Sequence, residues 1–319
     1  MLFWGGSWVS AKVLSVQADP LLLSFCRFLL VFLFAIPFSQ KEKRSKKKSL
    51  QLKTMDIRNI QHSWRWTILA SVFLTAYNLV FFGGLQFGFS GKAGVIVTSL
   101  NPLFAFMLAS LIEKNRPERL QIIGLLLGLC GGAMQTLPEI FWGDHTADIY
   151  TLFFVGAAIL WSLLTISSRK AQIYSGVFTY TSRVYGLSAL MLFLIMTISQ
   201  GLAWLKSPVL QDQYFWLNQL YLAGPAGLFA TGMYFWATHQ KGSGKAASFT
   251  FIVPISALLL GFLLLGEKIQ PWTIAGGGLS LAAVAIIQYT GRTPGRSFRQ
   301  SGKAGKTTVN DNNLAVDIP

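Results

Sequence analysis

The string SGKAGVIVTSLNPLFAFMLASLIE spans residues 90–113, and a second version, SGKAASFTFIVPISALLLGFLLLGE, spans residues 243–267. Each copy opens with Ser-Gly-Lys-Ala, continues as an apolar run that contains a proline (Pro102 or Pro254) and ends at a glutamate. The matching positions of the two strings are 152 to 154 residues apart, and three more pairs are 156 or 157 residues apart: Trp4 and Trp161, Lys12 and Arg169, and Arg27 and Arg183. This near-constant spacing indicates one ancestral unit present twice, in residues 2–138 and 149–290.

The composition indicates what this unit is made of. The chain has 319 residues, of which 52% are apolar and only 12% charged, against roughly 25% charged in soluble domains. Apolar runs of about 20 residues match the thickness of a bilayer core. We therefore predict an all-α, polytopic membrane protein with ten transmembrane helices, near 2–17, 20–39, 66–87, 94–112, 120–138, 149–167, 177–199, 217–239, 246–265 and 271–289.

The first of these runs is short. Trp4 lies at its very start, whereas the matching Trp161 lies well inside the run at 149–167. Either the first helix lacks its opening turns, or the true start of the protein lies upstream of Met1. A cleaved signal peptide is not expected, because residues 1–17 have no basic leading segment and no small-residue cleavage pattern before Asp19.

The distribution of charge predicts the orientation of the helices. Between residues 40 and 63 there are eight Lys or Arg and two acids, and the tail after Tyr289 adds five more cations. Segment 139–148 instead carries three acids and no Lys or Arg. Because basic loops stay on the cytoplasmic side, both termini and the 40–63 loop are expected in the cytoplasm, and 139–148 outside. Ten spans satisfy this arrangement.

The net charge of +15 does not indicate a nucleic-acid partner. A basic cluster next to a membrane span more often orients the protein or contacts anionic lipid. The expected partners are therefore the lipid bilayer and a small-molecule substrate, in the inner or plasma membrane. The tail, 291–319, is rich in Gly, Lys, Thr and Asn and is expected to be disordered.

Two copies of five spans have a mechanistic implication. Because five is odd, the second copy must enter the membrane from the opposite side, which gives an inverted-topology repeat. Such repeats are characteristic of secondary transporters, with the substrate site near the midplane between the halves. A duplicated bundle that acts as a scaffold or sensor without flux is the alternative from another class.

Glycines in two of the predicted helices indicate close packing. Gly124, Gly128 and Gly132 recur every four residues, and residues 276–278 are three consecutive glycines. Small residues at such spacing let helix backbones approach in a membrane. Packing within the monomer is the favoured interpretation, and a homodimer face is the alternative.

Four segments carry a resemblance to a known family. They are the Trp-Gly-Gly-Ser start with Lys12, SFCRFLL around Arg27, NPLFAFMLASLIE, and its counterpart VPISALLLGFLLLGE. In order and duplication they resemble the EamA family of the drug/metabolite transporter superfamily, over about residues 2–290. The resemblance implies ten helices, both termini inside, and export or exchange of small metabolites, without fixing the substrate.

Acidic residues are absent from the centres of the predicted spans. The related small multidrug resistance proteins carry a glutamate in the middle of the first helix, where this sequence has Gly-Gly-Ser-Trp-Val at 5–9. Because a carboxylate inside the membrane would be a strong functional signal, its absence disfavours proton-driven export of drug cations through such a residue.

Basic and neutral polar residues within the spans are the candidates for a substrate cavity. Arg27 and Arg183 could bind a substrate carboxylate or phosphate, or could snorkel to an interface. If both face the cavity, exchange of sugar phosphates or nucleotide sugars is favoured over amino-acid-like solutes. The neutral candidates, for which bonding between helices is the alternative role, are Ser7, Trp8, Asn78, Thr98, Asn101, Trp161, Thr165, Tyr234 and Thr238.

Pro102 and Pro254 are expected to break their helices and to free backbone carbonyls for substrate or water. Enzyme motifs are not found. Gly-Ser-Gly-Lys at 242–245 resembles part of a phosphate loop, but Ala246 replaces the required Ser or Thr. The three histidines are dispersed, and both cysteines lie inside apolar runs, so no metal or cofactor is expected. The sequence predicts a secondary transporter driven by a gradient or by exchange.

Overall fold

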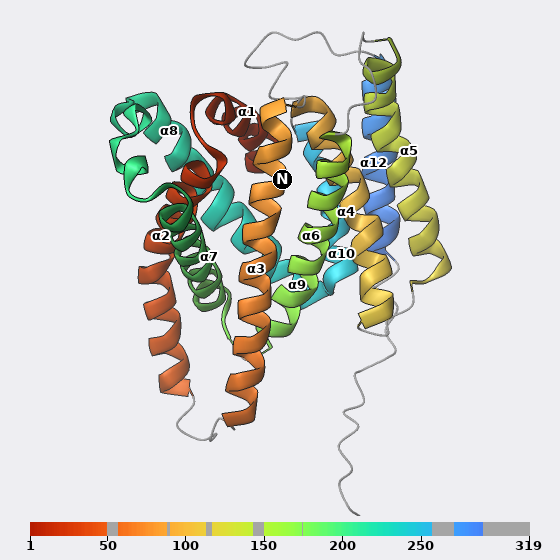
Figure 1. Cartoon of the computed structure of the whole chain (residues 1–319). Coiled ribbons are helices and arrows are strands. Elements are labelled where there is room, and N and C mark those ends of the chain that lie inside the picture. The colour runs from red at the N-terminus through yellow and green to blue at the C-terminus, as the bar shows by residue number, and fades with distance from the viewer. Residues whose placement is uncertain are drawn as a thin grey trace, which may run out of the picture.

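The computed structural model describes residues 1–49, 57–87, 90–112, 117–142, 150–173, 175–256 and 271–289. Within these ranges the chain is helical and contains no β-strand (Figure 1). The α-helices are α1 (Leu2–Gln17), α2 (Pro20–Ser49), α3 (Ile57–Phe87), α4 (Ser90–Ile112), α5 (Arg119–Trp142), α6 (Tyr150–Ala171), α7 (Val177–Gln200), α8 (Gln213–Tyr221), α9 (Gly232–Lys241), α10 (Ser243–Ser248) and α12 (Pro271–Tyr289). The other segments are η1 (Ala203–Lys206), η2 (Pro208–Gln211), η3 (Leu222–Thr231) and η4 (Phe249–Ile252).

The longest helices have the length and polarity of membrane spans. Four stretches are long and apolar enough to cross a bilayer: Pro20–Arg44, Gln61–Leu85, Leu152–Ala171 and Val177–Gln200. Shorter apolar helices cover Ile96–Ile112, Arg119–Met134 and Ile274–Tyr289. Large apolar side chains such as Leu111, Leu152 and Ile198 are exposed, as expected of a surface that faces lipid. The described residues are thus all helical and agree with a membrane protein, whereas ten spans in two repeats stay a prediction.

One predicted boundary differs from the structure. The loop expected to begin at residue 40 is helical as far as Ser49, because α2 continues through its Lys- and Arg-rich end. Lys, Arg and Glu are good helix formers, so the helix extends beyond its apolar part. Residues 50–56, Glu113, Glu267 and the tail 291–319 lie outside the described residues.

Helices distant in sequence pack side by side. The most extensive pairs are α2 with α7, α3 with α6, and α5 with α12 (Figure 1). The α2–α7 pair is joined near both ends. The Glu42 carboxylate accepts a hydrogen bond from the Thr179 backbone N–H at 2.8 Å, in the first turn of α7, where helix N–H groups lack partners of their own. At the other end Asp19 accepts from the Gln200 amide.

The glycines of α5 lie against other helices of the same chain. A Cβ on Gly124 would meet Ile287 of α12, and one on Gly128 would clash with the Phe251 ring. A Cβ on Gly131 would lie 2.7 Å from the Gly276 carbonyl oxygen. The predicted close approach of backbones therefore occurs within the monomer, between α5, α12 and η4.

The predicted span 217–239 is built from three pieces instead of one regular helix. Between α8 and α9, η3 is a π-helix that contains Pro225. Proline cannot donate a backbone hydrogen bond, and the wider turn brings the Thr231 hydroxyl to the Ala226 carbonyl at 2.9 Å. The regular α-helical period resumes in α9, where Tyr234 and Thr238 are both buried.

The packing of α5 on α12 predicts unequal effects of two glycine substitutions. Gly131→Ala should lower the free energy of unfolding by about 1–3 kcal/mol, because backbone atoms of Gly276 and Ser280 lie within 3.0 Å of the new Cβ. Gly278→Ala, on α12 with nothing within 4 Å, should be neutral or slightly stabilising. Reversible unfolding in detergent measures both, and equal losses would contradict the prediction.

Candidate functional site

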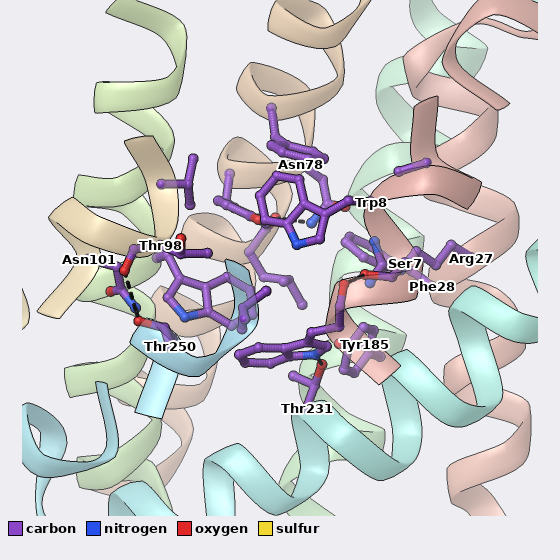
Figure 2. A pocket seen from close by; sticks show the side chains of 18 residues that line it. Ser7, Trp8, Arg27, Phe28, Asn78, Thr98, Asn101, Tyr185, Thr231 and Thr250 are labelled. Carbon is purple, nitrogen blue, oxygen red and sulfur yellow. Dashed lines mark hydrogen bonds between the residues drawn. The ribbon is translucent and has the colours of Figure 1, made fainter. Parts of the chain in front are cut away.

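A small cavity lies among the helices, lined by residues of α1, α2, α3, α4, α6 and α7 together with η3 and η4 (Figure 2). Its volume is about 60 Å³. A water molecule needs about 10–15 Å³ measured in this way, so the cavity has room for a few waters and not for a metabolite. A solute can enter only if the surrounding side chains or helices move apart.

Aromatic rings form a continuous wall of this cavity. Trp4 and Trp161 meet edge to face with their centroids 5.4 Å apart, and Tyr77 lies 4.8 Å from Trp161. Tyr77 stacks on Phe81 at 5.6 Å, and Trp8 meets Phe81 at 5.1 Å. Such tilted and edge-to-face contacts are the favoured arrangements of aromatic pairs. The wall therefore links α1, α3 and α6. A flat, apolar solute can take the place of one ring in these ring–ring contacts.

Trp4 is fixed by the π-helix opposite it. Its indole N–H lies 3.2 Å from both the Ala226 carbonyl and the Thr231 hydroxyl. Both acceptors belong to η3, whose wide turn presents them to α1 (Figure 2). Because a buried indole N–H needs an acceptor, the irregular helix positions the wall of the cavity.

Pro102 does not break its helix, since α4 runs through it from Ser90 to Ile112, but a side chain takes the place of the backbone donor that proline lacks. In a regular helix the N–H of residue 102 would donate to the Thr98 carbonyl, four residues earlier. Proline has no N–H, and the Thr250 hydroxyl lies 3.1 Å from that oxygen instead. The same hydroxyl lies 2.8 Å from the Ala247 carbonyl, so its single proton is shared between the two.

Asn101 extends this polar contact to a third helix. Its side-chain oxygen accepts from the Ser162 hydroxyl of α6 at 2.9 Å, and its amide nitrogen lies 3.5 Å from the Thr250 hydroxyl (Figure 2). Asn101, Ser162 and Thr250 are all buried. Side-chain networks of this kind rigidify a buried site when their members are satisfied, so α4, α6 and η4 are held together at the cavity.

Two groups at the cavity still need partners. The Arg27 Nε atom is buried without a hydrogen-bond partner among the described residues. Asn78 donates its amide to the Leu74 carbonyl at 3.1 Å, but its side-chain oxygen has no partner in the same ranges. No carboxylate is among the residues that line the cavity. Unpaired buried donors and acceptors are costly, so both atoms are natural attachment points for a solute.

The structure brings some of the predicted site residues together and separates others. The candidates that line the cavity are Ser7, Trp8, Arg27, Asn78, Thr98, Asn101 and Trp161. Pro102 is adjacent to Asn101, and Pro254 to the lining residue Val253.

The remaining candidates lie off the cavity wall. Thr165 and Tyr234 are buried and hydrogen-bonded to each other at 2.9 Å, and Thr238 donates to the Phe235 carbonyl. The Arg183 guanidinium lies 4.6 Å from the centre of the Trp64 ring, a cation–π contact. None of these four is among the lining residues.

Several lining residues were not among the sequence candidates: Trp4, Phe28, Tyr77, Phe81, Tyr185, Thr231, Thr250 and Val253. The repeat itself contained a signal for three of them. Trp4 is the counterpart of Trp161, and Thr250 and Val253 stand in the same positions relative to Pro254 as Thr98 and Asn101 do to Pro102. Within the described ranges no group of three or more metal-ligating side chains gathers.

Comparison with known proteins adds independent findings. A family model described as the EamA-like transporter family matches residues 1–136 and 148–289. The "Uncharacterized transporter YoaV" of Bacillus subtilis is 26% identical, covering 91% of this chain and 94% of its own. A "Probable amino-acid metabolite efflux pump" of Salmonella typhimurium is 25% identical, covering 95% and 96%. A protein known from a crystal structure has the same fold, with a TM-score of 0.67 and 17% identity over 91% of this chain and 94% of that chain.

The contact between Thr250 and the proline-freed carbonyl predicts an energetic coupling. Thr250→Val should lower the free energy of unfolding by about 1 kcal/mol, because the hydrogen bond from its hydroxyl to the Thr98 carbonyl is lost. In a Pro102→Ala background the restored N–H bonds this carbonyl, so the same substitution should cost less. A double-mutant cycle in detergent measures the difference, and strict additivity would contradict the assignment. Thr250→Ser, which keeps the hydroxyl, is the control.

Proposed function

The chain belongs to the EamA-like transporter family, and on that premise we propose that it is a secondary transporter that moves small amphipathic metabolites by alternating access. Members of this family are transporters rather than enzymes, and the apolar helices agree with an integral membrane protein. The observation that carries the proposal is a small, aromatic-walled cavity lined by residues from both halves of the chain.

The proposed architecture is two inverted five-helix repeats, residues 2–138 and 149–290, followed by the tail 291–319. Residues that match in the two copies meet at the cavity, which supports this layout. Trp4 contacts Trp161, and Thr250 contacts its counterpart Thr98. Two units related by a twofold axis place equivalent residues opposite each other where the axis passes.

Alternating access supplies the movement that the cavity requires. With about 60 Å³ of free volume, the aromatic-walled cavity must widen to admit a metabolite. Two similar halves can exchange conformations, so that the rings separate toward one side of the membrane and then toward the other. The free energy would come from an ion gradient or from exchange of solutes, and export is the proposed direction.

Amino-acid-like solutes are the favoured cargo class. The names of relatives in two bacteria, Salmonella typhimurium and Escherichia coli, refer to amino-acid metabolite efflux. Exchange of sugar phosphates would be favoured if Arg27 and Arg183 both faced the cavity. Arg183 lies over Trp64 instead, so this alternative loses the feature that would support it.

The inverted layout predicts that residues 46 and 144 lie on opposite sides of the membrane, because three proposed spans separate them. Lys46→Cys and Asp144→Cys, each made after replacing Cys26 and Cys130, test this with a membrane-impermeant maleimide. In intact cells only the cysteine at 144 should be labelled, and permeabilisation should expose the one at 46. Labelling of both in intact cells would contradict the layout.

Transport itself is tested in reconstituted vesicles with a panel of labelled amino acids, sugars and drugs. Asn78→Ala should lower flux of a transported solute about tenfold, the equivalent of one lost hydrogen bond of about 1.4 kcal/mol. Asn218→Ala is the matched control, since Asn218 of α8 also donates to the carbonyl four residues earlier but lies outside the cavity. Absence of flux for every solute would favour a scaffold or sensor.

A further inference from the structure

Arg27 is the only charged residue among those that line the cavity in the described part of the chain. Its Nε atom is buried and has no hydrogen-bond partner in that part. A cation at membrane depth requires a compensating anion or water. Tyr77 and Tyr185 line the same cavity, and a neutral phenol supplies no negative charge.

The second unpaired group has the opposite hydrogen-bonding character. The Asn78 side-chain oxygen can only accept, and the amide nitrogen beside it is already bonded to Leu74. A ligand that satisfies this oxygen must therefore present an N–H or O–H group. Between Arg27 and the Asn101–Thr250 group, which Figure 2 shows on opposite sides of the cavity, the space is bounded by aromatic rings.

The charge count distinguishes between classes of anion. A single guanidinium neutralises one negative charge and binds a carboxylate through two parallel hydrogen bonds. A phosphate monoester carries about −1.5 to −2 at neutral pH, and the matching cation of the second copy, Arg183, is engaged with Trp64 away from the cavity. A dianion would thus remain partly uncompensated, and a cationic solute would meet like charge with no carboxylate to offset it.

We propose that the cavity selects planar monocarboxylates and that Arg27 is the residue that binds the carboxylate and determines this specificity. The inference rests on the proposed transport function, because it assigns the cargo class of the same cavity. The aromatic wall contacts the flat body of the solute, and Asn78 accepts a hydrogen bond from a donor group where the solute has one.

Four solutes share a phenyl ring and differ in charge, so they distinguish the effect of charge on binding from the effect of shape. They are phenylacetate, phenylalanine, phenylacetamide and phenethylamine. Binding to the full-length protein in detergent is measured by calorimetry. Phenylacetate and phenylalanine should bind at least about tenfold more tightly than the neutral amide, as expected for a charge-assisted hydrogen bond, and phenethylamine should bind most weakly. Equal affinity for phenethylamine and phenylacetate, or no binding of any of the four, would overturn the proposal.

Two matched variants assign the effect to one residue. Arg27→Gln should reduce the preference for phenylacetate over phenylacetamide to about one, whereas Arg183→Gln, at the equivalent position of the other copy, should keep it. Arg27→Lys should retain a reduced preference, because a point charge replaces the planar fork. Unchanged selectivity in Arg27→Gln would overturn the assignment. If that variant does not fold, the order of the four affinities, measured on the wild-type protein and on Arg27→Lys, still tests the proposal.

Flux measurements show separately whether carboxylate recognition by Arg27 and whether transport itself is correct. Charge-selective binding with no flux of any solute in vesicles would reject transport and leave the recognition by Arg27 standing. Flux of several solutes without preference for the carboxylate would reject the recognition and leave transport standing.

Discussion

Backbone groups in a bilayer have no water to bond to, so each carbonyl must find a donor inside the protein. Pro102 withdraws one donor from α4, and the Thr250 hydroxyl from the other half of the chain lies beside the freed Thr98 carbonyl. The contact brings η4 to α4 at the level of Asn101, which in turn bonds Ser162 of α6. The cavity exists where these helices are held together, so its position follows from the need to satisfy a single oxygen.

The two halves of the chain contribute different chemical groups to the cavity, although their sequences are alike. Asn101 corresponds to Val253, and both line the cavity, so one copy contributes an amide where the other contributes an apolar group. Arg27 lines the cavity, whereas its counterpart Arg183 contacts Trp64. Among the lining residues in the described part of the chain, the charge is thus confined to the first half, whereas tryptophans of both halves, Trp4 and Trp161, line the cavity.

Much of the fold could be predicted because apolar runs of about 20 residues and the charges that flank them can be recognised in the sequence without knowledge of the tertiary structure. The π-helix η3 could not, since the apolar pattern does not distinguish a π-helical turn from an α-helical one. Thr231, the last residue of η3, lines the cavity, whereas Thr238 of α9 does not. Arg27 and Arg183 show a further limit: equal places in a repeat do not give equal surroundings, because each packs against different neighbours.

The hydrogen bonds of Glu42 and Asp19 tie α2 to α7 near both ends. A pair of long helices fastened at two distant points resists sliding and splaying, and it behaves as one rigid beam through the molecule. Rearrangements that widen the cavity must then be hinged on the helices around this beam. The short segments η3 and η4 interrupt the α-helical hydrogen-bond pattern beside the cavity, so we expect such bending to occur there.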